Sequence, residues 1–336
     1  MTERKQVVKT NNVHSKELTV NCGVPQGTIL GPLLFLIYIN DIFKVLPKGE
    51  LVSFADDTSI FIKDKSWEEV LKTAENKIAL IAGWLKDNYL SLNIDKTVFN
   101  TFGSYADSVP KTCELKIHKI NCTKGNCNCP KINRVVVTKY LGVYIDQHLK
   151  WKHHLLQLTQ KLRYLIFIFY KMKSLLNIKQ LLIIYHGLFW SVATYGIIAW
   201  GGVYENTLQP LLNVQKTIVK MIFKKKKSYP SEQLYREHLL INIKRFYIEK
   251  SIMYNFANLQ NQYKQIKNVK RTKTIIPQKT KKVISMRKHN VIGLKAFNML
   301  SENLKISYVK KLKNDKTLRK FICNLSRDNI KEIFSI

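Results

Sequence analysis

The chain contains the loop Cys22-Gly23-Val24-Pro25-Gln26-Gly27 and, further along, the segment Phe54-Ala55-Asp56-Asp57. Pro32 follows the loop and suits the first turn of a helix, so the pattern predicts an apolar helix over residues 32–46. Apolar runs flank the two neighbouring acids, which predicts a β-hairpin with Asp56 and Asp57 at its tip. The rest of the sequence is interpreted outward from these two segments.

The 336 residues are strongly basic, and the charge is concentrated in the second half. The chain has 56 Lys and Arg against 23 Asp and Glu, a formal net charge of +33. Residues 1–150 carry 20 basic and 15 acidic side chains, whereas residues 151–336 carry 36 and 8. The hydrophobic fraction of 46% excludes disorder over the whole length, a fibrous protein and a small disulfide-stapled domain. A polyanion held by the C-terminal half is the predicted partner.

Periodicity predicts the remaining elements. Two short strands over residues 4–22 meet at a turn, Asn11-Asn12. An amphipathic helix is predicted over 67–87, and strands over 98–102 and 135–145, the second bent at Gly142. Three apolar helices follow over 153–223, and the chain is basic and helical beyond that, with a linker over 264–283.

The run Leu181 to Val203 contains no Asp, Glu, Lys or Arg, and at about 1.5 Å per residue it is long enough to cross a bilayer. His186, Ser191 and four glycines interrupt it, which favours a buried helix and no membrane contact. A membrane-anchored basic protein is retained as a third hypothesis. Met1–Lys5 lacks the apolar region of a signal peptide, so we expect an intracellular protein, in the cytoplasm and/or the nucleus.

Adjacent aspartates are common in solvated turns, so Asp56-Asp57 alone identifies no site. A tight hairpin between apolar strands changes the expectation, because it raises both carboxylates into a cleft. There they can bind Mg²⁺, a hard cation that binds through one or two carboxylates together with substrate phosphates. Two such ions, about 4 Å apart, activate a primer 3′-hydroxyl and stabilise the leaving pyrophosphate. The hairpin therefore predicts the palm of a nucleic-acid polymerase.

The run Cys22 to Asp41, followed by Phe54-Ala55-Asp56-Asp57, resembles the reverse transcriptase of non-LTR (LINE-type) retrotransposons, in particular of Jockey-like elements. The resemblance implies an RNA-directed DNA polymerase that uses an RNA template, a DNA primer at a nicked target, deoxynucleotides and Mg²⁺ or Mn²⁺. It implies that Pro25, Gln26 and Gly27 contact the templating base and the incoming nucleotide. It also implies that Asp56 is a catalytic metal ligand and Asp57 a second, weaker one.

Further segments follow in the order of that family. Leu92-Asn93-Ile94-Asp95-Lys96-Thr97 resembles a segment whose lysine lies near the nucleotide phosphates, the position that Lys96 takes; alone, Lys96 is equally well a surface side chain. Tyr140-Leu141-Gly142-Val143-Tyr144-Ile145-Asp146 resembles the strand pair that grips the primer, which assigns Leu141, Gly142 and Val143 to this grip. By itself that segment is an ordinary core strand. The charge-free run Leu181 to Gly202 resembles the thumb helices of the family.

One departure from the family lies upstream. A complete reverse transcriptase carries another essential Asp on an earlier strand, whereas residues 1–40 contain no Asp. Asp41 is a poor substitute because it lies at the far end of the predicted helix. Asp56 and Asp57 point to opposite sides, as neighbours on an extended chain do. We therefore expect a truncated chain with little activity of its own, whose partner is the missing N-terminal part of the element's polyprotein.

Four cysteines, Cys113, Cys122, Cys127 and Cys129, lie in a polar insertion over 103–134. Four thiolates are the number that a structural Zn²⁺ requires, and His118 is a substitute ligand. Their spacings differ from the paired spacing of most zinc sites, so reduced thiols in a loop are the alternative. Cys22 and Cys323 are predicted to be small buried side chains.

Basic residues alternate with aromatic residues in the C-terminal half, as in Lys224 to Lys227 with Tyr229 and in Lys244-Arg245-Phe246-Tyr247. Lys and Arg bind phosphates and aromatic rings stack on bases, so nucleic-acid binding is predicted in preference to a merely solvated face. Lys224 to Lys227 equally match a short nuclear localisation signal. His153 and His154 are interpreted as structural, because no carboxylate or Cys lies at ligand spacing.

The sequence thus predicts an α+β fold in three parts. A partial polymerase palm, an antiparallel sheet with packed helices, covers 1–150 and includes the Cys-bearing insertion. A helical thumb covers 151–223, and a basic helical region covers 224–336. The predicted function is RNA-directed DNA synthesis, and the alternative is a non-catalytic RNA- or DNA-binding remnant of such an element.

Overall fold

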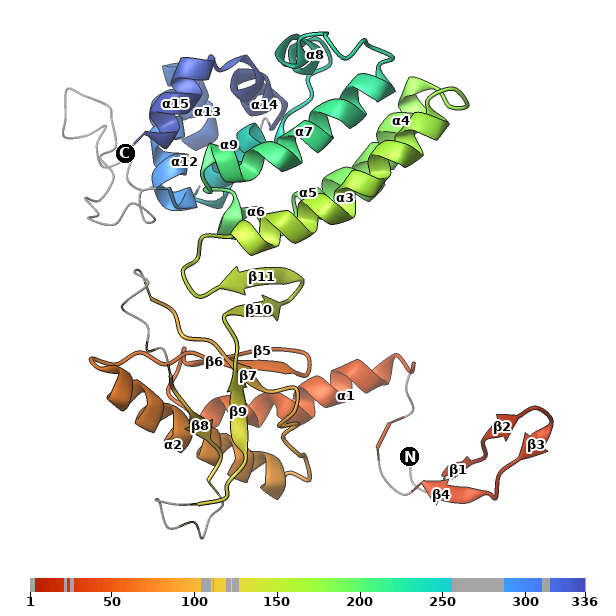
Figure 1. Cartoon of the computed structure of the whole chain (residues 1–336), viewed down its shortest axis with the longest axis vertical. Helices are drawn as coiled ribbons and strands as arrows, with labels where there is room; N and C mark the ends of the chain where they lie inside the picture. The colour runs from red at the N-terminus through yellow and green to blue at the C-terminus, as the bar shows by residue number, and fades with distance from the viewer. Residues whose placement is uncertain are drawn as a thin grey trace. The chain divides into compact units, whose positions relative to one another are not determined.

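A computed structural model describes residues 4–20, 23–24, 27–103, 110, 112–118, 122, 127–255, 287–309 and 315–335. The chain divides into two compact units, Met1–Val136 and Val137–Ile336, each of which is described by itself (Figure 1). Cys22, Pro25, Gln26 and the linker predicted over 264–283 lie outside the described residues. The division falls at residue 136, whereas the sequence analysis ended the palm at residue 150; the assignment of the three parts stays a prediction.

The described part of the first unit combines short strands with two helical segments. Its strands are β1 (Arg4–Gln6), β2 (Lys9–Thr10), β3 (Val13–His14), β4 (Leu18–Val20), β5 (Leu51–Phe54), β6 (Asp57–Ile60), β7 (Val98–Phe99), β8 (Leu115–Lys116) and β9 (Lys131–Arg134). Its helices are α1 (Leu30–Ile39), which continues as a 3₁₀ helix (Asn40–Lys44), and α2 (Trp67–Asp87).

These strands do not form the single antiparallel sheet that was predicted. In the described part of the unit they form separate small sheets: β1 with β4, β2 with β3, β5 with β6, and the three strands β7-β9-β8. β7 and β9 run parallel, because the long insertion between them returns the chain in the same direction. The hairpin predicted at Asn11-Asn12 is confirmed, with φ of 44° and 65° at its two turn residues.

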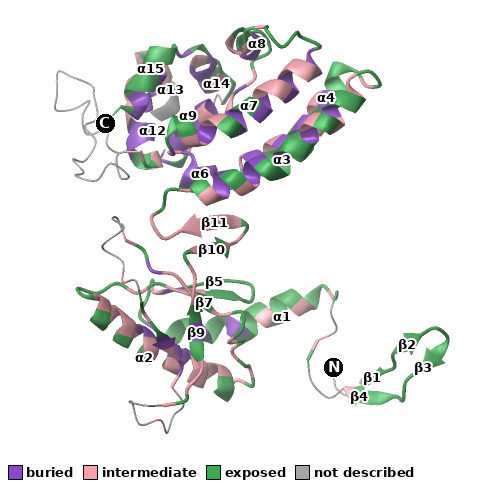
Figure 2. Cartoon of the chain, viewed as in Figure 1, coloured by how far each residue is buried: buried purple, intermediate pink, exposed green. Residues whose placement is uncertain are grey.

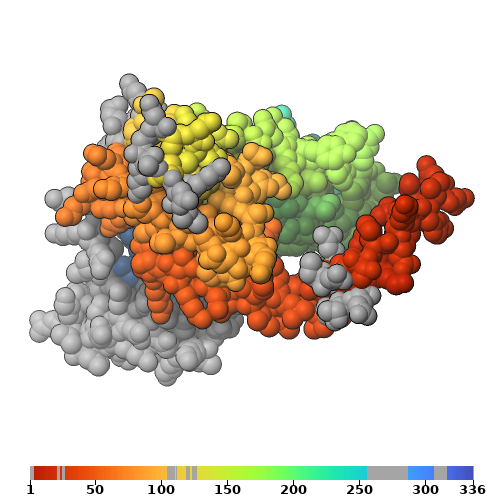
Figure 3. All heavy atoms as spheres, turned by 90° about the horizontal axis from the view of Figure 1, so that it is seen from below, coloured from red at the N-terminus to blue at the C-terminus, as the bar shows by residue number. Residues whose placement is uncertain are grey.

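Helix α2 organises the rest of the first unit. Ser66 and Glu69 form a capping box at its start, as the sequence Ser-x-x-Glu favours. The C-terminal half of the apolar face of α2 packs against the 3₁₀ helix and β5 in a cluster around Ile42 and Ile81. The N-terminal half of the same face packs against β8 and β9 around Ile78 and Leu115. In Figure 3 the yellow atoms of the β9 region lie directly against the orange atoms of residues 60–100.

The second unit begins with a β-hairpin, and the rest of its described part is mainly helical. The segment predicted as one bent strand over 135–145 is two strands, β10 (Val137–Tyr140) and β11 (Val143–Asp146), because the chain reverses at Leu141-Gly142. The helices are α3 (Lys152–Met172), α4 (Ile178–Ile184), a π-helix (Tyr185–Trp190), α5 (Ser191–Ala193), α6 (Ile197–Trp200), α7 (Glu205–Ile222), α8 (Ser231–Glu237), α9 (Ile243–Tyr254), α12 (His289–Asn298), α13 (Glu302–Val309), α14 (Asp315–Asn324) and α15 (Arg327–Phe334).

The charge-free run 181–203 is divided among several of these helices. It contains α4, the π-helix, α5 and α6, and Gly196, with a φ of 64°, separates the last two. Its side chains at Leu181, Phe189 and Trp200 are completely buried. Within the part of the chain that the structure describes, no helix combines the length and apolar character that a membrane crossing requires.

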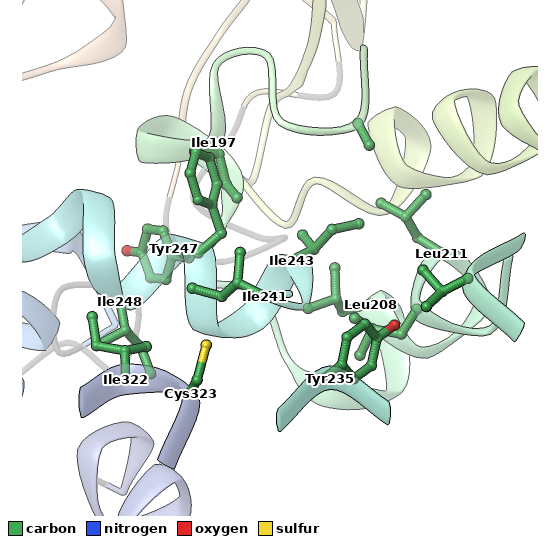
Figure 4. Packing of buried hydrophobic residues seen from close by; sticks show 14 of the residues in the cluster. Ile197, Leu208, Leu211, Tyr235, Ile241, Ile243, Tyr247, Ile248, Ile322 and Cys323 are labelled. Carbon is green, nitrogen blue, oxygen red and sulfur yellow. The ribbon is translucent and has the colours of Figure 1, made fainter. Parts of the chain in front are cut away.

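One large hydrophobic cluster holds the second unit together. It extends from α3 through α7 and α9 to α12, α14 and α15, whose buried residues are purple in Figure 2. Figure 4 shows Tyr247 and Ile248 of α9 beside Ile322 and Cys323 of α14. The burial predicted for Cys323 is therefore confirmed.

Buried polar side chains connect the helices within this core. The Arg245 guanidinium is 1% exposed, donates to the carbonyl oxygens of Cys323 and Leu325 at 2.9 Å, and pairs with Glu232. The buried Gln215 amide donates to Tyr185 and accepts from the backbone N–H of Ile243. Because each of these groups has several partners, it specifies how the C-terminal helices dock.

Candidate functional site

The two adjacent acids lie where the sequence predicts them, at the tip of a hairpin. β5 and β6 pair in register from Leu51 opposite Ile60 to Phe54 opposite Asp57, which leaves Ala55 and Asp56 as the two turn residues. Ala55 has a φ of 52°, a left-handed conformation that is strained for a residue with a side chain. The Ser53 hydroxyl donates to the Ala55 carbonyl oxygen at 3.1 Å and stabilises the turn.

The base of this hairpin is anchored while its tip is open. Leu51 is buried among apolar residues of the 3₁₀ helix and α2. Lys77 of α2 pairs with Glu50 at 2.6 Å, just before β5 begins. Asp56 and Asp57 are both exposed. Packing therefore determines the direction of the hairpin, and the carboxylates project from a rigid support into solvent.

Both carboxylates are available to a ligand. Among the described residues, neither side chain has a hydrogen-bond or ion-pair partner, in contrast to Asp41, which pairs with Lys44 at 2.8 Å. Two neighbouring carboxylates with free oxygen atoms are the donor set that Mg²⁺ and Mn²⁺ prefer. The residues present thus fit a divalent metal.

Two more residues predicted for this site lie in the same unit. Gly27 is exposed and has a φ of 85°, which favours glycine there. Lys96 is exposed in a turn where the Asn93 side chain accepts from its backbone N–H at 3.1 Å. In the described part of the unit, no hydrogen bond or ion pair joins Gly27 or Lys96 to the two acids. Pro25 and Gln26 lie outside the described residues.

The turn between β10 and β11 is the second candidate element. Leu141 and Gly142 both have positive φ, 44° and 83°, as a type I′ hairpin turn requires. The Tyr195 hydroxyl donates to the Leu141 carbonyl oxygen at 2.8 Å. A Cβ at Gly196 would lie only 3.1 Å from Val143, so the glycine lets the hairpin approach. The segment before α6 therefore clamps the turn that carries Leu141, Gly142 and Val143.

A pocket of about 600 Å³ opens beside this turn. Leu141, Gly142 and Tyr195 line it, together with Gln157 and Lys161 of α3. Lys139 and Lys161 add positive charge to its wall. Polar, basic and apolar groups in one open pocket suit a sugar-phosphate chain with stacked bases.

His154 also lines this pocket. It is 5% exposed, packs against Trp200, and accepts from the backbone N–H of Tyr144 at 3.4 Å. Burial, together with the neighbouring His153, lowers the pKa of His154 below its usual range. The histidine is therefore neutral and links β11 to α3, in agreement with the structural role predicted for it.

The exposed face of α3 carries aromatic and basic side chains in alternation. Tyr164, Phe167 and Tyr170 are each more than half exposed. The Lys171 ammonium lies 5.6 Å from the Phe167 ring, and Lys173 lies 4.4 Å from that of Tyr170. Large exposed rings beside cations are unusual on a purely solvated helix and are typical of single-strand nucleic-acid surfaces.

A cluster of sulfur and imidazole groups lies elsewhere in the first unit. The side chains of His118, Cys122, Cys127 and Cys129 approach one another, and their ligand atoms all lie within 4.8 Å. Cys113 is not in this group; among the described residues, His118 stands in its place. The backbone N–H of Cys129 lowers the pKa of the Cys127 thiol to about 7. These four residues could hold a metal ion.

Sequence reasoning missed two side chains that shape the site. Tyr195, which clamps Leu141, lies far from it in the sequence. The only sequence signal that could have identified Tyr195 is its position directly before Gly196. Asp146 ends the motif quoted for the primer grip, and its carboxylate accepts from the backbone N–H groups of His148, Lys150 and Trp151. It therefore shapes the connection from β11 to α3, a role that an Asp six residues before the start of a helix indicates only weakly.

A family model described as "Reverse transcriptase (RNA-dependent DNA polymerase)" matches residues 2–175. The match is longer than half of the chain, and it includes both hairpins, β5–β6 and β10–β11. No solved structure matches the chain significantly.

The curated relatives that match the chain are also named as RNA-directed DNA polymerases. "Probable RNA-directed DNA polymerase from transposon BS" of Drosophila melanogaster is 25% identical over 234 residues, which cover 66% of this chain and 24% of that protein. "Probable RNA-directed DNA polymerase from transposon X-element" of the same species is 23% identical, over 65% of this chain and 24% of the relative. "RNA-directed DNA polymerase from mobile element jockey" is 24% identical over 48% of this chain and 17% of the relative. The chain thus spans about a quarter of the length of the first two relatives.

Proposed function

Because the chain belongs to the reverse transcriptase (RNA-dependent DNA polymerase) family of non-LTR retrotransposons, we propose that it supplies the catalytic hairpin and the primer-holding segment of an enzyme that copies RNA into DNA. The observation that carries the proposal is the β5–β6 hairpin. It presents Asp56 and Asp57, exposed and without partners among the described residues, within the region that the family model covers.

In this proposal, Asp56 is the principal ligand of Mg²⁺ or Mn²⁺ and Asp57 a second, weaker one. The bound metals supply the charge that activates a primer 3′-hydroxyl and stabilises the leaving pyrophosphate. The anchored base of the hairpin holds the carboxylates in place, so little reorganisation is needed when a nucleotide binds. The first unit then corresponds to part of a palm, and the helices after β11 to a thumb.

The remaining predicted residues bind the other reactants. Pro25, Gln26 and Gly27 contact the templating base and the nucleotide, and Lys96 lies near the nucleotide phosphates. Leu141, Gly142 and Val143 hold the primer end beside the basic pocket. Support for the last assignment comes from the Tyr195 clamp, which makes this turn rigid. The partners are accordingly an RNA template, a DNA primer or target, and deoxynucleotides.

We expect little polymerase activity when this chain is assayed alone. Asp56 lies in the turn and Asp57 begins β6, so a single hairpin supplies both carboxylates, and a further carboxylate from the rest of the polyprotein would complete the metal site. The face of α1 supports such a partner, because Leu33, Leu36 and Ile37 are each more than half exposed. An intracellular location, in the cytoplasm or the nucleus, stays part of the proposal, and the exposed Lys224 to Lys227 suit a nuclear signal.

Primer extension tests the proposal. The chain, with and without the upstream region of a Jockey-type polymerase added in trans, is given an RNA template, a DNA primer, labelled nucleotide and Mg²⁺ or Mn²⁺. We expect incorporation mainly with the added region, abolished by Asp56→Ala with Asp57→Ala and retained in Asp41→Ala, whose carboxylate is also exposed. Equal incorporation by the double variant would overturn the assignment. Strong incorporation without the added region would overturn the expectation of low activity.

A non-catalytic RNA- or DNA-binding remnant is the second candidate, and the exposed basic and aromatic face of α3 favours it. Binding of a labelled primer–template is expected to weaken steeply with salt, and further in Lys161→Glu and Arg163→Glu. Lys331→Glu on α15 is the matched control. No incorporation in any condition, with salt-sensitive binding retained, would select this second function, whereas salt-independent binding would exclude phosphate contacts.

A further inference from the structure

The fold of the insertion brings the cysteine side chains together, whereas the spacing of the cysteines in the sequence does not match that of most zinc sites. β8 and β9 are antiparallel, with Lys116 opposite Lys131. The backbone N–H of Ile117 donates to the Pro130 carbonyl oxygen at 3.0 Å, which extends the pairing by one residue. Continued by one more position, the same register places His118 opposite Cys129, just beyond the end of the paired strands. Cys122 and Cys127 lie between them in the sequence and converge on the same point.

Three of the six distances between the ligand atoms match those around a tetrahedral ion, and all six lie within 4.8 Å. His118 Nδ1 lies 3.5 Å from the Sγ atoms of both Cys122 and Cys127. The Sγ atoms of Cys122 and Cys129 are also 3.5 Å apart. Zn–S bonds of about 2.3 Å and Zn–N bonds of about 2.0 Å place neighbouring ligand atoms of a tetrahedron about 3.5–3.8 Å apart. None of the described cysteines is in a disulfide.

A carboxylate behind the histidine gives a second, independent observation. His118 Nε2 lies 3.4 Å from Glu75 Oε2, so the nitrogen that faces away from the sulfur atoms has an anionic partner. The other oxygen of Glu75 accepts from the backbone N–H of Lys116 at 3.2 Å. A carboxylate that orients a histidine in this way is the usual outer partner of a zinc-bound imidazole. Because Glu75 belongs to α2, the cluster is attached to the principal helix of the first unit.

We propose that His118 Nδ1 and the Sγ atoms of Cys122, Cys127 and Cys129 bind one structural Zn²⁺ ion. Four protein ligands leave no open position for water or substrate, so the ion stabilises the insertion and takes no part in catalysis. Binding releases the thiol protons, and three thiolates with a neutral imidazole give the site a net charge of −1. Soft thiolate ligands select zinc over Mg²⁺, which keeps this site distinct from the pair of aspartates. Cys113 is not a ligand.

Metal analysis of the purified full chain tests the site without any polymerase assay, so its outcome is independent of the proposed function. We expect about one zinc per chain by mass spectrometry of the metal content, after growth with zinc and purification under reducing conditions. Cys127→Ser is expected to lose most of the zinc, and Cys113→Ser, the matched control, to keep it. Glu75→Gln should still bind zinc, with an affinity about 10–100-fold lower in a chelator competition.

A second measurement uses the unaltered chain, so it tests the site even if the variants fail to fold. Cobalt(II) added to the metal-free chain should give the visible absorption bands and the sulfur charge-transfer band of a tetrahedral thiolate site. Less than about 0.1 zinc per chain together with no such bands would overturn the proposal. So would equal zinc loss in Cys113→Ser and Cys127→Ser, or a Cys122–Cys129 disulfide found in the reduced-buffer preparation by mass spectrometry.

Discussion

The two units of the chain bury apolar side chains to very different extents. In the described part of the second unit, forty buried residues form a single cluster, whereas the described part of the first unit has two clusters of five buried residues, arranged one after the other along the same face of α2. α1 leaves most of its apolar side chains exposed, and Figure 2 shows it largely green. The second unit therefore has a core of the size that sustains a domain, while the first unit carries the candidate catalytic hairpin on a support that is only partly covered.

The largest expected effect is a loss of stability in the second unit, which is the better packed of the two. Arg245→Ala removes a buried guanidinium that forms an ion pair with Glu232 and donates hydrogen bonds to the carbonyl oxygens of Cys323 and Leu325. The half-buried Glu232 carboxylate and two carbonyl groups would lose their partner, so we expect the free energy of unfolding of the second unit to fall by about 3–5 kcal/mol in urea titrations. Arg236→Ala, at an exposed position of α8, should change it by less than about 0.5 kcal/mol. Equal effects would show that burial of Arg245 does not organise the core.

A smaller effect is expected where the second unit meets its own hairpin. Gly196 has a φ of 64°, and an added Cβ would approach Val143 to 3.1 Å. Gly196→Ala should therefore cost about 1–3 kcal/mol and loosen the β10–β11 turn, observable as faster amide hydrogen exchange at Val143. Gly187→Ala in the π-helix has open space and an ordinary φ, so it should be neutral or stabilising. Unchanged exchange in Gly196→Ala would contradict the clamp.

Acid is expected to weaken the second unit through its buried histidine. The lowered pKa of His154 means that the unfolded chain binds the proton first, so stability is present above the ordinary histidine pKa and is lost as the pH falls below about 6.5. Protonation also removes the Nδ1 acceptor of the Tyr144 N–H. Thermal unfolding from about pH 7 to about pH 5 measures the loss, which His154→Phe should reduce. The same pH dependence in both proteins would exclude His154 as its source.

The smallest expected effect is on the stability of the first unit, and it tests whether the apolar face of α1 is uncovered. Ile37 of α1 is 66% exposed, so Ile37→Lys should change the free energy of unfolding by no more than about 0.5 kcal/mol while it reduces binding of an apolar fluorescent dye. Ile42, on the 3₁₀ helix, is 1% exposed, and Ile42→Ala should cost about 2–4 kcal/mol. A large loss of stability in Ile37→Lys would mean that the face of α1 is covered within the chain itself.

Local patterns were sufficient for the elements that depend on neighbouring residues. The Asn11-Asn12 turn, helix α2 and the acidic tip of the β5–β6 hairpin all agree with the sequence analysis, because turn residues, a capping box and apolar spacing act over a few positions. Periodicity predicted one strand bent at Gly142 where the chain reverses, although the family resemblance implied a strand pair there. Leu rarely adopts a positive φ, and a distant tyrosine, Tyr195, holds Leu141 in that conformation. The roles of Pro25, Gln26, Gly27 and Lys96 stay predictions.

By itself, the sequence determined that this is a basic α+β chain of the reverse transcriptase family, with two adjacent acids on a hairpin. Only the tertiary structure decided which cysteines and which histidine meet beside Glu75, and that His154 and Tyr195 support the β10–β11 turn. The physical reason is separation along the chain. Hairpin and helix signals are encoded by residues a few positions apart, whereas a tetrahedral cluster or a clamp requires side chains that only strand register and core packing bring within about 3.5 Å of one another.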